Sequence, residues 1–211
     1  MAGAGEASLT LAGSCAIDEL ALFPLQTVLF PGGRLPLRIF EQRYMDMAKT
    51  CLRDQTPFGV CLIREGAEVG APALPMEIGC LARIVEWDME QLGVLQVVAR
   101  GEQRFRVLER RTQPDGLLRA SIELLHEEGD AEIPARCVTC ARLLERVIDQ
   151  RSGLFEPPHR LDSSAWVSSR LAEILPLPLA VKQELLEIAD GRTRLERLNG
   201  FLSKEPARDD T

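Results

Sequence analysis

The stretch LFPLQTVLFPGGRLPLRIFEQRY, residues 22–44, decides how the N-terminal half of the chain folds. It contains two short apolar runs that prolines interrupt. Because proline fixes φ and lacks an amide donor, neither run can be a helix or a central strand over its full length. We therefore expect edge or barrel-rim strands, at Ala21–Leu25 and Leu35–Ile39.

A tight reversal should join these two strands. Gly32 and Gly33 follow Phe30 and Pro31 directly, and glycine supplies the positive φ angles that such a turn needs. The sequence leaves two alternatives open for Phe30. Its side chain is either exposed at the tip of the turn, beside Arg34, or packed in the core.

A helix should follow, from about Glu41 to Arg53, because the spacing of apolar residues changes to three and four after Ile39. Glu41 and Arg43 are two positions apart on that helix, so we expect them to find separate partners.

Further strands are expected at 58–64, 76–90, 94–100, 104–111 and 118–124, with Gly101 interrupting the chain between 94–100 and 104–111. Helices should then cover 135–150 and 179–189, with another capped by Asp162 or Ser163 and a last one opened by a capping box of Thr193 and Glu196.

The predicted organisation has two cores. The acidic stretch 127–134 has no periodic apolar face, so we expect it to be a hinge. The predicted parts are a flexible tail at 1–16, a β-rich part with one helix at 17–126, the acidic linker at 127–134, a helical domain at 135–204 and a flexible tail at 205–211.

Composition excludes several classes of function. The chain is 45% hydrophobic and 27% charged, which is the ordinary globular balance, and no apolar run is long enough to span a membrane. No secretory signal opens the sequence, so we expect a cytoplasmic protein without a membrane partner. The net charge of −7 makes nucleic acid an unlikely partner.

The sequence offers no chemistry for catalysis. It has no phosphate loop, no nucleophile elbow and no metalloprotease helix, so we predict no catalytic residue, no cofactor and no enzyme activity. Cys137 and Cys140 have the spacing of a metal pair, but a second pair or a nearby histidine is missing. We expect all six cysteines to be reduced and metal-free.

The opening motif resembles the N-terminal, substrate-binding domain of Lon proteases. The similar segments are FPL at 23–25, VLFPG at 28–32, LPL at 35–37, IFE at 39–41 and RY at 43–44, and leucine-rich helical segments extend the resemblance to about residue 203. The resemblance implies an α+β fold: an antiparallel β pseudo-barrel, PUA-like, followed by a four-helix part. It also implies a free-standing version of the domain, because the ATPase and peptidase motifs of a Lon protease are missing.

The function implied by the resemblance is non-catalytic recognition of unfolded or tagged polypeptide segments. The partners would be polypeptide clients, with a protease or chaperone as a further partner and weak self-association. Two alternatives stay open, namely an RNA-binding PUA-like module and a regulatory subunit that docks on one fixed protein.

The site residues expected from the motif fall into two groups. The candidate peptide-binding residues are Phe30, Pro31, Arg34 and Trp87. For Trp87 the alternatives are a groove lining and a barrel plug, and we favour the plug. The other motif residues are expected to be structural, with Phe23, Phe40 and Tyr44 in the core; these are Phe23, Pro24, Gly32, Pro36, Phe40, Glu41, Arg43 and Tyr44.

Overall fold

The computed structural model describes residues 16–91, 93–126, 130–151 and 153–203. The tails predicted at 1–16, apart from Ala16, and at 205–211 lie outside the described residues, as do residues 127–129 of the predicted linker.

The described chain has a β-rich first part and a helical second part, as the α+β prediction requires. Six strands come first, with one helix between the second and the third: β1 (Ala16–Leu25), β2 (Arg34–Ile39), α1 (Gln42–Asp54), β3 (Phe58–Glu65), β4 (Leu74–Gln91), β5 (Val94–Thr112) and β6 (Leu118–Leu124). The C-terminal part is helical: η1 (Ala135–Cys137), α2 (Val138–Gln150), α3 (Ser164–Ile174), α4 (Leu179–Glu187) and α5 (Gly191–Leu202).

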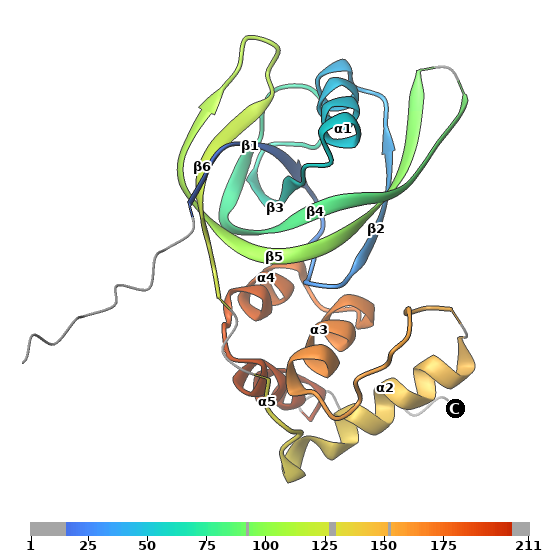
Figure 1. Ribbon diagram of the computed structural model, residues 1–211. Coiled ribbons are helices and arrows are strands. Elements are labelled where there is room, and N and C mark those ends of the chain that lie inside the picture. The colour runs from blue at the N-terminus through green and yellow to red at the C-terminus, as the bar shows by residue number, and fades with distance from the viewer. Residues whose placement is uncertain (1–15, 92, 127–129, 152, 204–211) are drawn as a thin grey trace, which may run out of the picture.

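The strands form a barrel with one added edge strand. Their order is β2-β5-β4-β3-β1-β6, and a pairing of β5 with β6 closes the ring. The pairing of β1 with β3 is parallel, whereas the other strand pairs are antiparallel. Figure 1 shows α1 above the barrel, the helices α2 to α5 below it, and the β4–β5 hairpin extending away from it as an arm.

Pro24 and Pro36 each lie where only one of the described strands pairs with the chain. Strand β2, which carries Pro36, pairs only with β5 among the described strands, as the edge-strand prediction requires. Strand β1 lies between β6 and β3, so an edge assignment for the whole strand is wrong. Its pairing with β6 ends at Leu22, where its pairing with β3 begins, so Pro24 still has one partner strand.

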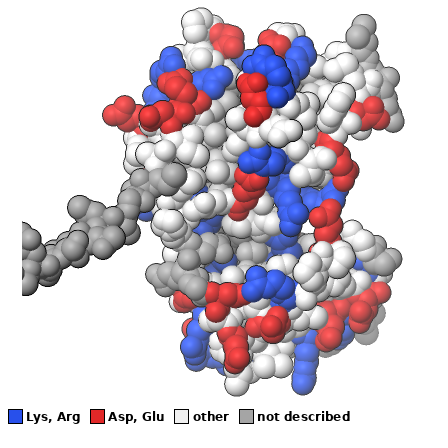
Figure 2. All heavy atoms as spheres, viewed as in Figure 1, with Lys and Arg blue, Asp and Glu red and all other residues white. Residues whose placement is uncertain are grey.

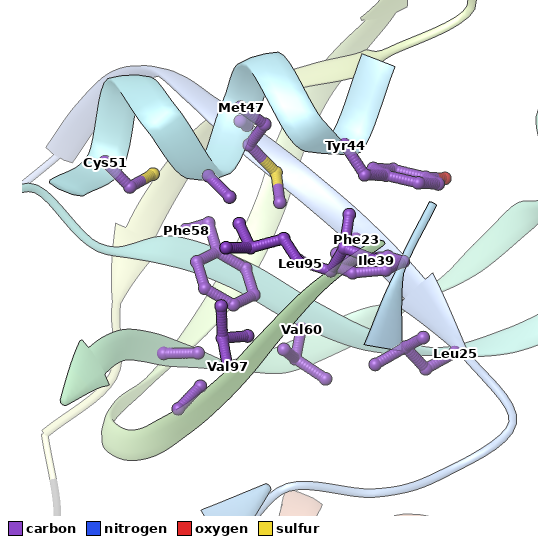
Figure 3. Close-up of a cluster of buried hydrophobic side chains, with 14 of the residues drawn as sticks. Phe23, Leu25, Ile39, Tyr44, Met47, Cys51, Phe58, Val60, Leu95 and Val97 are labelled. Atoms are coloured by element: carbon purple, nitrogen blue, oxygen red, sulfur yellow. The ribbon is translucent and has the colours of Figure 1, made fainter. Parts of the chain in front are cut away.

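The barrel core lies under α1. Tyr44 and Met47 point from the helix toward the sheet, where they pack in one cluster with Phe23 and Phe58 (Figure 3). The rings of Phe23 and Tyr44 stack with their centroids 4.0 Å apart. The prediction that Phe23 and Tyr44 belong to the core is therefore confirmed.

Glu41 and Arg43 form an ion pair, contrary to the expectation of separate partners. Helix α1 begins at Gln42, and Glu41 precedes it with extended backbone, so the helical spacing does not apply to the pair. The carboxylate of Glu41 lies 2.8 Å from Nη2 of the buried Arg43. Arg43 also donates to the carbonyls of Gly70 and Gly116, so one guanidinium ties two loops to the start of the helix.

The reversal at 30–33 docks against β5, which runs through Gly101 without the expected interruption. The amide of Gly32 donates to the Gly101 carbonyl at 2.8 Å, and the amide of Gly101 donates to the Gly33 carbonyl at 2.8 Å. Gly32 has φ +77°, as the turn prediction requires. At Gly33 the constraint is different: a Cβ there would displace the carboxylate of Glu173.

Two helix starts test the capping predictions. Ser163 caps α3, since its Oγ accepts from the Trp166 amide at 3.0 Å. The predicted capping box of Thr193 and Glu196 is wrong. Helix α5 begins at Gly191, and the carboxylate of Asp190 caps it by accepting from the Thr193 amide at 3.0 Å.

The barrel and the helices share a core. Phe30 is 0% exposed and packs with Val28 and Leu62 in the cluster that the helices build around Leu171 and Leu185. Hydrogen bonds also join the two parts. The guanidinium of Arg170 donates to the Pro31 carbonyl at 2.7 Å, that of Arg104 to the Leu186 carbonyl at 2.9 Å, and the Gln183 amide to the Ile78 carbonyl at 3.0 Å.

The barrel also has its own cluster under α1, but the cluster around Phe30 belongs to both predicted parts, so they pack against each other. The exact domain boundaries stay a prediction, but the described part of the acidic stretch is fixed in place, because the Ser164 amide donates to the Ala131 carbonyl at 2.9 Å. An exposed Phe30 at the tip of the turn is wrong. The turn faces the helices, and an aromatic side chain between two packed parts loses its contact with water.

Candidate functional site

The four predicted binding residues do not gather in one place. Phe30 is buried and Pro31 is half-buried, with its carbonyl held by Arg170. Arg34 is bound to two carboxylates, those of Glu86 and Glu156. Trp87 is 61% exposed, so the favoured alternative of a barrel plug is wrong. Of the four, only Trp87 offers a large exposed apolar surface.

Phe40 is the aromatic residue that the sequence interpretation misplaced. It was expected in the core, and it is 57% exposed. The physical reason is the end of β2 at Ile39: Leu35, Leu37 and Ile39 pack on the core, so the alternation of the strand turns Phe40 to the opposite side before α1 begins.

A groove of about 350 Å³ lies beside β2. Buried side chains of the barrel, including Phe23 and Tyr44, contribute to its lining, and Phe40 and Val69 are exposed at it. Polar side chains of Arg38, Glu41 and Glu68 also line it. We call this pocket the β2 groove; its lining residues are Phe23, Leu25, Thr27, Leu35, Pro36, Leu37, Arg38, Ile39, Phe40, Glu41, Tyr44, Glu68 and Val69.

Trp87 lies beside the β2 groove, on the arm. The strand register pairs Trp87 with Val97 and Val97 with Leu37, so the three residues form one cross-strand row from the arm to β2. A neighbouring hollow of about 570 Å³ includes Trp87 and shares Leu37 with the groove. Val85 and Met89, two residues to either side of Trp87, are also exposed, so the arm adds apolar surface.

The free edge of β2 is only partly protected. An edge strand can pair with an added strand, and proteins limit this with prolines and charged residues. Pro36, Arg34 and Arg38 supply that protection on β2, and all three are exposed. The strand therefore accepts an extended segment more readily through side-chain contacts in the groove than through a continuous ladder of backbone hydrogen bonds.

A second pocket, of about 460 Å³, lies at the waist between barrel and helices. Figure 2 shows basic and acidic side chains close together on one face of this waist. Arg170, from α3, is 4% exposed and donates to Glu173 at 2.8 Å. Burial raises the pKa of the Glu173 carboxyl to about 8, against the opposing charges of Arg170 and Lys182. This pocket, which we call the waist pocket, was not predicted from the sequence.

The cysteines do not form a reactive cluster among the described residues. Cys51, Cys61, Cys80, Cys137 and Cys140 are buried free thiols, whereas Cys15 lies outside the described residues. Burial raises the pKa of Cys61 to about 12 and that of Cys140 to about 11, which disfavours the thiolate needed for metal binding. In the part of the chain that the structure describes, His, Cys, Asp and Glu side chains form no group of three that could hold a metal ion. None of the described helices is long and apolar enough to cross a membrane.

The described chain is thus a small closed barrel with an open groove at an edge strand, joined to a helical part. Comparison with known proteins gives the family. The sequence model of the substrate-binding domain of the ATP-dependent protease La (Lon) matches residues 19–204. The chain therefore belongs to the Lon substrate-binding domain family, and the predicted resemblance is confirmed.

Individual relatives agree with this family. A Lon N-terminal domain protein from Xanthomonas campestris has 37% identity and a TM-score of 0.74, with 90% of this chain and 100% of that chain covered. The Lon protease of Anaeromyxobacter dehalogenans is 28% identical over 195 residues, which are 88% of this chain and 23% of that protein. The protein cereblon of Gallus gallus is 32% identical over 106 residues, 49% of this chain and 23% of cereblon.

The chain spans about a quarter of the length of the curated Lon relatives that it matches. The family match covers the part of Lon that binds substrates and not the part that carries out catalysis.

Proposed function

We propose that the chain binds unfolded or tagged polypeptide segments without catalysis, through the β2 groove and the adjacent arm. The observation that carries this proposal is the pair of exposed aromatic residues in a domain of a substrate-binding family: Phe40 at the β2 groove and Trp87 at the neighbouring hollow, two pockets that share Leu37. Exposed apolar side chains that lie close together are typical of a surface that binds a partner.

An extended segment suits the dimensions of this surface. Strand β2 has six residues, and an extended partner of that length spans about 20 Å. Alternate side chains of such a segment point the same way, so its apolar residues can enter the groove while the intervening ones stay in water. Recognition by apolar contacts at alternate positions depends little on the exact sequence. That property fits clients that share exposure of apolar residues rather than a common motif.

The charged side chains at the groove affect which polypeptide segments it can prefer. Arg38, Glu41 and Glu68 bring charges of both signs, so the groove does not select strongly acidic or strongly basic segments. The chain is acidic overall, with a net charge of −7, which disfavours RNA relative to polypeptide. We expect weak binding at each site, because a narrow groove buries little area.

The test uses two alanine variants and a matched control. Phe40→Ala and Trp87→Ala should each weaken binding of a labelled, permanently unfolded protein about 5- to 30-fold, the loss of a moderate aromatic anchor. Each should change the free energy of unfolding by less than about 1 kcal/mol, because exposed side chains contribute little to the core. Fluorescence anisotropy and denaturant melts measure the two effects.

Leu108→Ala is the control. Leu108 lies on β5, is 54% exposed and lines neither the β2 groove nor the waist pocket, so its removal changes exposed apolar surface elsewhere. Binding by the control should match the wild type. Equal losses in all three variants would show that binding is not located at the groove, and tight binding of a labelled RNA in place of the unfolded protein would favour the alternative function.

A further inference from the structure

The waist pocket carries an excess of positive charge in an acidic chain. Among the described residues that line it, five are basic and two are acidic. Glu86 and Asp130, which lie outside the lining, pair with Arg34 and Arg160, so an excess of one positive charge remains, whereas the whole chain has a net charge of −7. The basic residues come from both parts of the molecule, including Arg34 of β2, Arg100 of β5 and Arg170 of α3. A pocket of this charge attracts an anion.

The pocket already holds one carboxylate from the chain itself. Glu156, on the loop between α2 and α3, bonds to Nη1 of Arg34 through Oε1, and its Oε2 lies 3.8 Å from Nη1 of Arg100. One carboxylate thus lies between two guanidinium groups, which is the arrangement that arginine forms with carboxylates in general. Glu156 is half exposed, so a carboxylate from solution can compete with it.

The other half of the pocket is apolar. Phe155 and Trp166 meet edge to face with their centroids 6.0 Å apart, and the guanidinium carbon of Arg170 lies 5.6 Å from the centroid of Phe155. Leu29 and Ile174 also line this side. A ligand that fits the pocket therefore has a carboxylate next to an apolar group.

Arg170 gives the pocket a rigid basic wall. Its guanidinium is fixed by the Pro31 carbonyl and Glu173, and its buried Nε has no hydrogen-bond partner among the described residues. A buried donor without a partner is costly and uncommon in folded proteins.

The waist pocket and the β2 groove lie at the two ends of one strand. Both are lined by Thr27 and Leu35, Arg34 at the start of β2 lines the waist pocket, and Ile39 at its end lines the groove. An extended polypeptide antiparallel to β2 can therefore place its last residue at the waist and earlier residues in the groove.

We propose that the waist pocket binds the C-terminal carboxylate of a polypeptide whose last residues are apolar. This inference rests on the proposed function and names a second contact for the same client. Arg34 and Arg100 hold the carboxylate, Phe155 and Trp166 contact the last side chain, and Glu156 occupies the carboxylate position when no client is bound.

The test compares two forms of one labelled peptide of ten residues that ends in leucine, one with a free carboxylate and one with a C-terminal amide. We expect the acid to bind about tenfold more tightly, the ratio given by one charge-assisted hydrogen-bonded contact. Arg100→Gln should reduce this ratio to about two or three. Glu156→Gln should raise affinity for the acid, because the competing carboxylate is removed, and leave affinity for the amide unchanged.

Two matched controls separate local contacts from overall charge. Arg106 lies on the same strand as Arg100, has a similar exposed fraction (50% against 54%) and also lies 3.8 Å from a carboxylate, but outside the pocket. Arg106→Gln should keep the wild-type ratio. Glu184→Gln is the control for Glu156→Gln, since Glu184 is equally exposed, pairs with Arg197 and lines no part of the waist pocket.

Each outcome separates this inference from the proposed function. Equal binding of acid and amide, with both weakened by Phe40→Ala, overturns the carboxylate site and leaves the groove in place. An acid preference that Arg100→Gln does not reduce also overturns it. Complete displacement of the acid peptide by an equal concentration of N-acetylleucine would show a site for small carboxylic acids instead. Absence of binding by either peptide, with the unfolded protein still bound, overturns the carboxylate site alone. Absence of binding by the peptides and by the unfolded protein overturns both proposals.

Discussion

Replacing Phe30 with alanine should lower the free energy of unfolding by about 3–5 kcal/mol, the usual cost of removing a buried phenylalanine side chain. Phe30 is fully buried between the barrel and the helical part, in a cluster that includes Val28, Leu171 and Leu185. Its removal leaves a cavity where the two parts meet. Urea denaturation monitored by circular dichroism measures the loss.

The control for this experiment is Phe40→Ala, which removes the same side chain from an exposed position and should cost less than about 1 kcal/mol. The Phe30 variant should also split the unfolding transitions of the barrel and the helices, because it weakens the cluster that joins them. A Phe30→Ala protein as stable as the Phe40→Ala protein would contradict the shared core.

The second large effect is expected at Gly101. Gly101→Ala should cost about 2–3 kcal/mol, at the upper end of what overpacking costs in a well-packed core. A Cβ at this position would collide with the backbone carbonyl of Phe30, and a carbonyl in a tight turn cannot move aside as a flexible side chain can. The alanine would also strain the two 2.8 Å hydrogen bonds that join Gly101 to Gly32 and Gly33.

Gly200→Ala is the matched control for Gly101→Ala. Gly200 lies within α5, and no atom would come within 4 Å of a Cβ there outside the helix's own neighbouring backbone. Alanine is a better helix former than glycine, so the control should be neutral or more stable by up to about 1 kcal/mol. Thermal and urea denaturation of both variants measure the two changes in stability. Equal stability of the two variants would show that the turn does not depend on close approach to β5.

The sequence predicted most of the fold because the signals were local or came from the family motif. The edge position of β2 follows from Pro36, the turn follows from Gly32, and Ser163 is recognisable as a cap. These features depend on residues within a few positions of one another. The C-terminal helices were predicted from apolar spacing and capping residues. The closed barrel came from the resemblance, because periodicity alone does not say which strands pair.

The errors arose where one periodicity gives way to another. Phe40 was assigned to the helical pattern of Tyr44, although α1 begins only at Gln42, and the alternation of β2 turns Phe40 outward. The same shift explains the pair of Glu41 and Arg43, since Glu41 is not yet helical. Applying the strand period through residue 40 would have placed Phe40 at the surface.

Contacts between distant segments could not be read from the sequence. Phe30 is buried by helices more than a hundred residues away, and a local pattern of turn residues gives no information on that contact. The waist pocket has the same origin. Arg34, Arg100 and Glu156 have no common motif. Arg34 and Arg100 are partners in the pairing of β2 with β5, and Glu156 reaches them from the loop between α2 and α3.

Hydrogen–deuterium exchange with and without a permanently unfolded client tests the central claim most directly, because it reports where the client binds on the unaltered protein. The account predicts slower exchange in the peptides that cover residues 34–40, which include β2 and Phe40, and residues 85–89 of the arm. Exchange in α5 should be unchanged. Protection confined to the helices α2 to α5, or no protection at client concentrations that saturate the anisotropy signal, would contradict binding at the β2 groove.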